Sequence, residues 1–164
     1  EYLTSIGAKR GAMAALIEEA TEEAEREAQE DRAELDSMNE QGLPLVQACW
    51  DGDLARVKEL VAGGMGPNLV VMGTTPLIAS IGPDQSPELA KFLLSKGADP
   101  DIANDDGQTA LIAACIGANT TFVKILLDAG ADPNKSMAGL PPIEFARMSG
   151  SPEIEALLKK AGAR

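Results

Sequence analysis

The sequence predicts an all-α solenoid of stacked helix-turn-helix units with short hairpin-like loops, preceded by a long N-terminal helix. Three observations predict it. A five-residue segment recurs every 33 residues, a second landmark recurs in register with it, and apolar residues make up 45% of the 164 residues while aromatic residues make up only 3%. Small aliphatic side chains must therefore build the core at close range, and a repeat of this length is typical of stacked helical units.

The first landmark marks the end of each unit. Residues 97–101 (GADPD) recur as residues 130–134 (GADPN), and a weaker copy precedes them at residues 64–68 (GMGPN). Glycine readily adopts the left-handed conformation that stops a helix, so Gly64, Gly97 and Gly130 are predicted to end three outer helices.

The second landmark marks the start of each inner helix. It reads GTTPL at residues 73–77, GQTAL at 107–111 and GLPPI at 139–143, with a shortened copy at 42–45. Proline suits the first helical position, because its φ is preset and its missing N–H would be unsatisfied there anyway. Pro44, Pro76 and Pro142 are therefore predicted to start inner helices.

Apolar runs at helical spacing lie between the landmarks and predict the outer helices. One run is Leu54, Val57, Leu60 and Val61, and another is Phe122, Val123, Leu126 and Leu127. The second unit has an atypical loop at residues 81–87, where Ser86 and Pro87 are predicted as the cap and first residue of an outer helix. Because each helix pair has an apolar face that it cannot bury alone, neighbouring units must stack.

These residues resemble the ankyrin repeat. The closest matches to its consensus are residues 75–78 (TPLI), 123–127 (VKILL) and 130–134 (GADPN). The resemblance covers residues 39–164 as four copies, with approximate bounds of 39–70, 71–102, 103–134 and 135–164. It implies a protein-binding module that acts without catalysis.

Residues 1–38 are predicted to form an acidic helical extension. No Gly or Pro interrupts residues 12–40, and residues 18–40 hold 11 acidic and two basic side chains, so a long helix is expected. Two interpretations stay open: the helix caps the apolar side of the first repeat, or it projects as an arm that contacts a partner.

Most enzyme chemistries are excluded by composition. The chain has no His, which removes the common triads, Cys-His pairs and His-containing zinc sites, and we expect no enzymatic activity, cofactor or metal. Residues 104–107 (NDDG) resemble a calcium loop only faintly and are better read as a hairpin tip. Cys49 and Cys115 lie two periods apart at small core positions, so buried free thiols in a reducing compartment are expected.

Partner contacts are placed by the resemblance, since ankyrin-like proteins usually bind through hairpin tips and inner-helix ends that form a concave groove. Trp50 is the strongest single candidate, because aromatic anchors dominate interface energetics. Methionines at such positions suit a partner-facing surface, since their side chains are flexible and polarizable. The candidate contact residues are Trp50, Asp51, Val71, Met72, Thr74, Asp105, Asp106, Gln108, Ile116, Met137, Ala138, Leu140 and Met148.

The predicted function is that of an adaptor or accessory subunit of a larger assembly, acting through its groove and its N-terminal helix. The net charge of −12 argues against nucleic acid as a direct partner. The alternative is an acidic regulator that masks a basic protein surface. No segment reads as a membrane span, and the first residue, Glu1, suggests a fragment or processed chain. We expect an intracellular, soluble protein, in the cytoplasm or in an organelle after removal of a transit peptide.

Overall fold

The computed structural model describes residues 20, 21, 23, 24, 26, 28, 29, 42–82 and 84–164. The chain divides into two units, Glu1–Met38 and Asn39–Arg164. In the first unit the described residues are helical and exposed. Most of the helix predicted over residues 12–40, together with both of its expected roles, lies outside the described residues.

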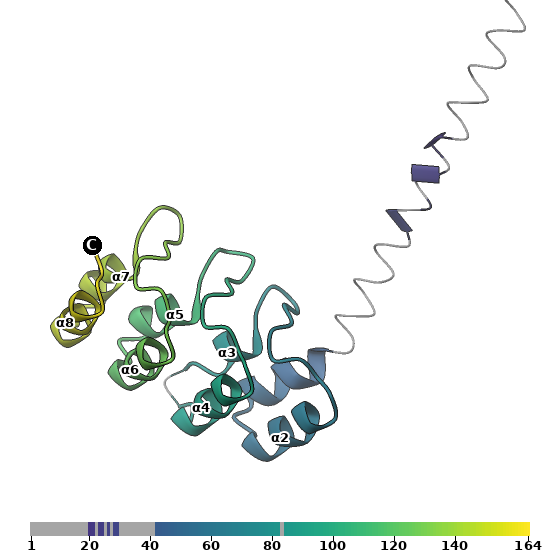
Figure 1. The fold of residues 1–164 in the computed structure, drawn as a ribbon, viewed down its shortest axis with the longest axis horizontal. Helices are drawn as coiled ribbons and strands as arrows, with labels where there is room; N and C mark the ends of the chain where they lie inside the picture. Colours follow the sequence, from purple (N-terminus) through teal and green to yellow (C-terminus); the bar gives the residue numbers. More distant parts are fainter. Residues whose placement is uncertain (1–19, 22, 25, 27, 30–41, 83) are drawn as a thin grey trace, which may run out of the picture. The chain divides into compact units, whose positions relative to one another are not determined.

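The second unit is a row of helix pairs, as Figure 1 shows. Each inner helix is followed by an outer helix, and like helices of successive pairs contact one another: α3 with α5 and α5 with α7, then α2 with α4, α4 with α6 and α6 with α8. Among the described residues the only extended pairing is two isolated antiparallel bridges. The predicted all-α stack is therefore confirmed. The helices are residues 42–50, α2 (Leu54–Ala62), α3 (Pro76–Ala79), α4 (Pro87–Ser95), α5 (Ala110–Ile116), α6 (Thr120–Asp128), α7 (Pro142–Met148) and α8 (Pro152–Lys160).

Helix starts follow the predicted capping chemistry, with one exception. Pro76 and Pro142 open α3 and α7, and Pro87 opens α4 behind its cap Ser86. The prediction for Pro44 is wrong, because residues 42 and 43 are already helical. Proline is tolerated in the first helical turn, because the N–H groups there have no intrahelical partner, so helical residues 42 and 43 can precede Pro44. Gly42 packs ahead of it: it is buried, and a Cβ there would overlap a Val71 methyl carbon.

Helix ends confirm the role of the repeated glycines. Gly64, Gly97 and Gly130 end α2, α4 and α6 with φ of 100°, 89° and 91°. In the first of these, the Gly64 N–H donates to Val61 O (3.1 Å) and the Met65 N–H to Leu60 O (3.1 Å), which closes a Schellman motif. Both bonds recur after Gly97 and Gly130. Equivalent exits of this kind are what a stack of like units requires.

The core lies between the inner and outer helices of the second unit. Its largest fully buried side chain is Phe122, which is 1% exposed. The large side chains that follow it are aliphatic, including Leu89, Leu111 and Leu126, each 0% exposed. The prediction of a core built mainly from aliphatic side chains is confirmed.

A ladder of side-chain hydrogen bonds joins successive exits. Asn68 accepts from the Asp99 N–H (2.8 Å) and donates to Gly97 O (3.0 Å). Asn134 makes the same pair of bonds with Arg164 and Gly162 at the last exit. The middle rung has Asp101, whose carboxylate accepts from the Asp132 N–H (2.9 Å) but has no amide to donate. Sequence reasoning missed this ladder, although the Asn-Asp-Asn pattern at the fifth landmark position was its signal.

Candidate functional site

The first and last described hairpin tips have the same two-residue turn. Val71 and Thr74 exchange backbone hydrogen bonds of 2.8 and 3.0 Å, and the two residues between them, Met72 and Gly73, have φ of 50° and 69°. Met137 and Leu140 repeat the arrangement around Ala138 and Gly139. Positive φ at both central positions defines a type I′ turn. Met72 is left 68% exposed at its tip.

The tip between them is longer and acidic. The Asn104 N–H donates to Gln108 O (2.9 Å), and the Asn104 carboxamide oxygen accepts from the Asp106 and Gln108 N–H groups (3.0 and 2.8 Å). Asp105 and Asp106 are exposed on this tip. The turn expected at residues 104–107 is confirmed, although no bridge joins the residues that flank it.

The ends of the inner helices carry exposed apolar side chains at equivalent repeat positions. Trp50 is 44% exposed, Ile116 is 48% exposed and Met148 is 75% exposed. Gly82 holds the same position in the second repeat, so the row of bulky side chains is interrupted there. A hollow of about 190 Å³ lies between α5 and α7, lined by Ile116, Phe145, Met148 and Ser149. Large apolar groups left in water contribute little to folding, so this row is a candidate contact surface.

The structure places most of the predicted contact residues on the surface and two of them inside. Val71 is 1% exposed and Thr74 is 9% exposed, because their backbones close the hairpin while the Val71 side chain packs in the core. Their side chains are therefore not part of the exposed surface. Met137 and Gln108 are half-buried, and Met137 packs against the core. The exposed members are Trp50, Asp51, Met72, Asp105, Asp106, Ile116, Ala138, Leu140 and Met148, which we call the inner surface.

Sequence reasoning also missed two exposed apolar residues and one buried residue that lines the inner hollow. Val70 is 43% exposed next to the first tip, and Leu43 is 38% exposed at the first inner helix. Phe145, which lines the hollow, is 8% exposed. Their positions in the repeat could have identified two of them. Val70 precedes a hairpin tip, and Phe145 lies three residues before Met148, on the same face of α7.

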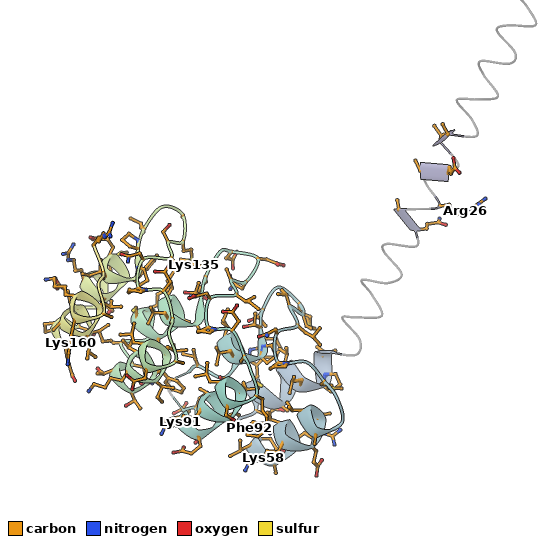
Figure 2. The ribbon with its side chains drawn as sticks, in the orientation of Figure 1. Arg26, Lys58, Lys91, Phe92, Lys135 and Lys160 are labelled. Atoms are coloured by element: carbon orange, nitrogen blue, oxygen red, sulfur yellow. The ribbon has the colours of Figure 1, made fainter. Side chains whose placement is uncertain are left out.

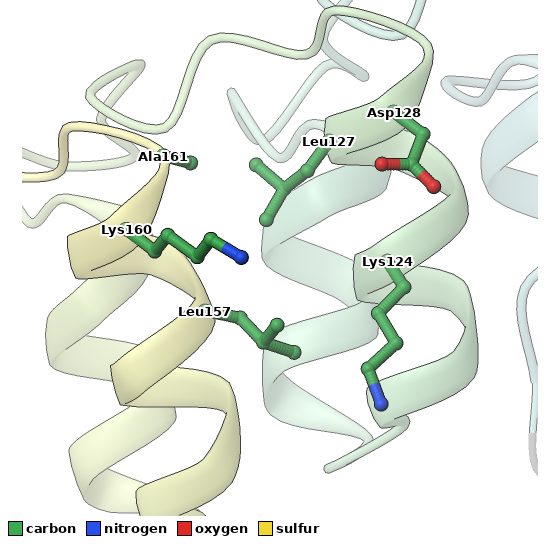
Figure 3. A pocket seen from close by; sticks show the side chains of 6 residues that line it. All are labelled: Lys124, Leu127, Asp128, Leu157, Lys160 and Ala161. Atoms are coloured by element: carbon green, nitrogen blue, oxygen red, sulfur yellow. The ribbon is translucent and has the colours of Figure 1, made fainter.

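A second hollow lies on the opposite side of the helix pairs, between the outer helices α6 and α8 (Figure 3). It measures about 250 Å³, and Leu127 and Leu157 line it together with Lys124, Asp128, Lys160 and Ala161. Lys124 forms an ion pair with Glu153 (3.0 Å). Its mixed lining contrasts with the apolar lining of the inner hollow.

Charge is unevenly divided between the two sides of the stack. Lys58, Lys91 and Lys160 lie on α2, α4 and α8, whereas Lys135 lies in the loop that precedes the last tip (Figure 2). Among the described residues the ion pairs join Arg56 to Glu59, Lys124 to Glu153, Lys159 to Glu155, and Arg147 to both Glu144 and Glu155, so none includes an aspartate. The exposed aspartates of the inner surface therefore have no cationic partner among these residues.

The two cysteines are buried free thiols, as expected, and each directly precedes an exposed member of the inner surface. Burial raises the pKa of both the Cys49 and the Cys115 thiol from 9.0 to about 12. A protonated, enclosed thiol is a poor nucleophile, since the thiolate is the reactive form. The cysteines are therefore core residues.

Within the described residues, no three or more His, Cys, Asp or Glu side chains lie together as a metal site would require. No helix there is both long and apolar enough to cross a bilayer.

Comparison with known proteins is consistent with this geometry. A family model described as ankyrin repeats, in three copies, matches residues 79–164. The chain is 33% identical over 126 residues to ankyrin repeat, SAM and basic leucine zipper domain-containing protein 1 of Dasypus novemcinctus, covering 71% of this chain and 26% of that protein.

Two human proteins are similar at the same level. Transient receptor potential cation channel subfamily A member 1 is 32% identical over 131 residues, covering 78% of this chain and 12% of the channel. SH3 and multiple ankyrin repeat domains protein 2 is 34% identical over 98 residues, covering 58% of this chain and 5% of that protein. The chain thus spans about a quarter or less of these relatives.

Proposed function

The chain belongs to the ankyrin repeat family, whose repeats form protein–protein interaction modules and are generally not enzymes; from this premise we propose that it is an adaptor or accessory subunit that holds a partner protein on its inner surface. The observation that carries the proposal is the row of exposed apolar side chains at equivalent inner-helix ends, Trp50, Ile116 and Met148. Tryptophan is enriched among the residues that dominate interface energetics, and methionine is enriched at interface cores.

The hollow beside this row supports a peptide or protein partner over a small molecule. Its volume of about 190 Å³ is below the roughly 300–1,000 Å³ of typical small-molecule sites. Ile116 and Met148 stand at its rim and Phe145 is buried beneath them. Such a hollow suits one apolar side chain of a larger partner.

The exposed tips add further apolar contact area. Met72 is 68% exposed and Leu140 is 43% exposed, on turns whose backbone hydrogen bonds hold them in place. Little ordering entropy is then lost when a partner binds, because the turn conformation already exists.

The test is affinity capture from native extract with the full chain and a Met72→Asp/Met148→Asp variant. Both side chains are largely exposed, so we expect loss of the specifically captured proteins with a thermal midpoint within about 2 °C of the parent. Met137→Asp is unsuitable for this purpose, because Met137 packs against the core.

The matched control carries two acidic substitutions on the outer helices, Thr121→Asp and Ala156→Asp, at positions that are exposed. It changes net charge by the same amount as the test variant. Equal loss of capture by the two variants, or retained capture by the inner variant, would contradict the proposal.

The alternative role as an acidic regulator stays a prediction, since it depends on residues 18–40, of which only a few are described. Competition between the captured partner and nucleic acid, abolished by substituting those glutamates with glutamine, would favour it.

A further inference from the structure

The partner's chemistry follows from the charges that accompany the inner surface. Asp51 directly follows Trp50, and Asp84 stands beside Gln85, whose side chain donates to the Trp50 carbonyl oxygen (2.7 Å). Both aspartates are exposed. One acidic residue therefore adjoins Trp50 in the sequence. The other adjoins Gln85, whose side chain is hydrogen-bonded to Trp50.

The middle tip, which precedes α5, carries a further pair of acidic groups. Asp105 and Asp106 are exposed there, and the Asp105 N–H lies 3.4 Å from Gly73 O of the preceding tip. The exposed cations of the inner helices do not offset these charges, because Arg147 is already bonded to Glu144 and Glu155.

Most of the described lysines lie on the outer helices, namely Lys58, Lys91, Lys124, Lys159 and Lys160. Lys135 is the exception, since it lies in the loop just before the last tip (Figure 2). An excess of acidic over basic groups on one side produces a negative potential, which steers and orients a positively charged partner.

We propose that the inner surface binds a basic segment of a partner protein, one that places an aliphatic side chain in the hollow between Ile116 and Met148 and Lys or Arg side chains opposite Asp51, Asp84, Asp105 and Asp106. The inference rests on the proposed function and specifies its partner. It is carried by two features together: the largely apolar lining of the hollow, and the exposed aspartates after the inner helices and on the middle tip, none of which is in an ion pair among the described residues.

Trp50 supplies the readout, since it is the chain's single tryptophan and belongs to the inner surface. The full chain is titrated with three synthetic peptides that share one leucine pattern and carry Lys, Gln or Glu at every polar position. We expect saturable change in Trp50 emission with the lysine peptide, binding at least about tenfold weaker with the glutamine peptide, and none with the glutamate peptide. The preference for lysine should shrink as salt screens the charges.

Two triple variants with equal changes of net charge locate the effect. Asp51→Asn/Asp84→Asn/Asp106→Asn removes inner charges, and Glu59→Gln/Asp128→Asn/Glu153→Gln removes outer ones. We expect the inner variant to bind the lysine peptide at least about tenfold more weakly and the outer variant to change less than about twofold. Equal losses would overturn the inference, because they would reflect only the net charge of the chain.

An Ile116→Asp variant separates failure of this inference from failure of the proposed function. If the glutamine peptide binds as tightly as the lysine peptide and Ile116→Asp abolishes both, the surface binds partners but selects no positive charge. If Ile116→Asp leaves lysine-peptide binding intact, the inner surface is not the binding site. Both results contradict the basic-segment proposal, and only the second contradicts the proposed function.

Discussion

The two sides of the stack are built from the same repeats but leave different residues in water. On the outer helices the exposed positions are largely charged, and ion pairs such as Lys124–Glu153 and Lys159–Glu155 form there. On the inner surface the exposed positions include Trp50, Ile116 and Met148. The outer side therefore exposes mainly charged groups to water, whereas the inner side exposes apolar groups that are not buried in the core.

This difference separates residues that stabilise the stack from residues available for binding. Adjacent residues in one helix illustrate it: Cys49 is 0% exposed and Trp50 is 44% exposed, and the same change occurs from Cys115 to Ile116. Substitutions on the two kinds of position should therefore affect different properties.

The largest effect is expected where the comparison is sharpest, between a buried outer-helix leucine and an exposed inner-helix methionine. Leu126→Ala should lower the free energy of unfolding by about 2–5 kcal/mol, because it leaves a cavity in the core. Met148→Ala should change it by less than about 0.5 kcal/mol, since Met148 is 75% exposed. Urea denaturation followed by circular dichroism measures both. Similar losses would mean that Met148 supports the fold.

The thiols test burial on the inner helices directly. A pKa raised from 9.0 to about 12 makes the thiolate fraction of folded Cys49 and Cys115 about a thousandfold smaller near neutral pH. Alkylation should therefore be far slower in the folded protein than in urea. Rapid modification without unfolding would contradict the burial.

The same shift predicts a dependence of stability on pH. The folded-state pKa of each thiol is raised, so its contribution to stability is fully present below about pH 9 and is lost as the pH rises toward 12. The urea midpoint should fall over that window. Replacing both cysteines with alanine should make the fall smaller.

The ladder between repeat exits gives the smallest expected effect. Asp101→Asn should add a donor toward Gly130 O, as Asn68 donates to Gly97 O, and raise the free energy of unfolding by about 0.5–1.5 kcal/mol. Asn134→Asp is the reciprocal variant and should lower it by a similar amount. A destabilising Asp101→Asn would show that the middle rung depends on its carboxylate.

Much of the fold could be predicted from the sequence because local chemistry and repetition agree. Ser86 and Pro87 identify a helix start, and Gly64, Gly97 and Gly130 identify helix ends, since few other residues suit those dihedral angles. The prediction that Pro44 starts its helix is wrong, because proline is tolerated at several positions of the first turn and packing decides which residue comes first.

The candidate site could be predicted only in part. The position of a residue in the repeat located Trp50, Ile116 and Met148, all of them exposed. Val71 and Thr74 share a tip with Met72 but are buried, contrary to the prediction. Neighbouring side chains of a hairpin face opposite sides, and which side is buried depends on the adjacent repeat. The charge difference between the two sides of the stack likewise required three-dimensional placement.

The most direct test of the account places a photo-reactive benzoylphenylalanine at one of two positions in the full chain. One protein carries it at Met148 on the inner surface and the other at Lys124 on the outer helices. After irradiation in native extract, the account predicts a discrete covalent adduct from position 148 that the Met72→Asp substitution removes, and no such adduct from position 124. An adduct formed from position 124 and absent from position 148 would contradict the account, because it would place the partner on the opposite side.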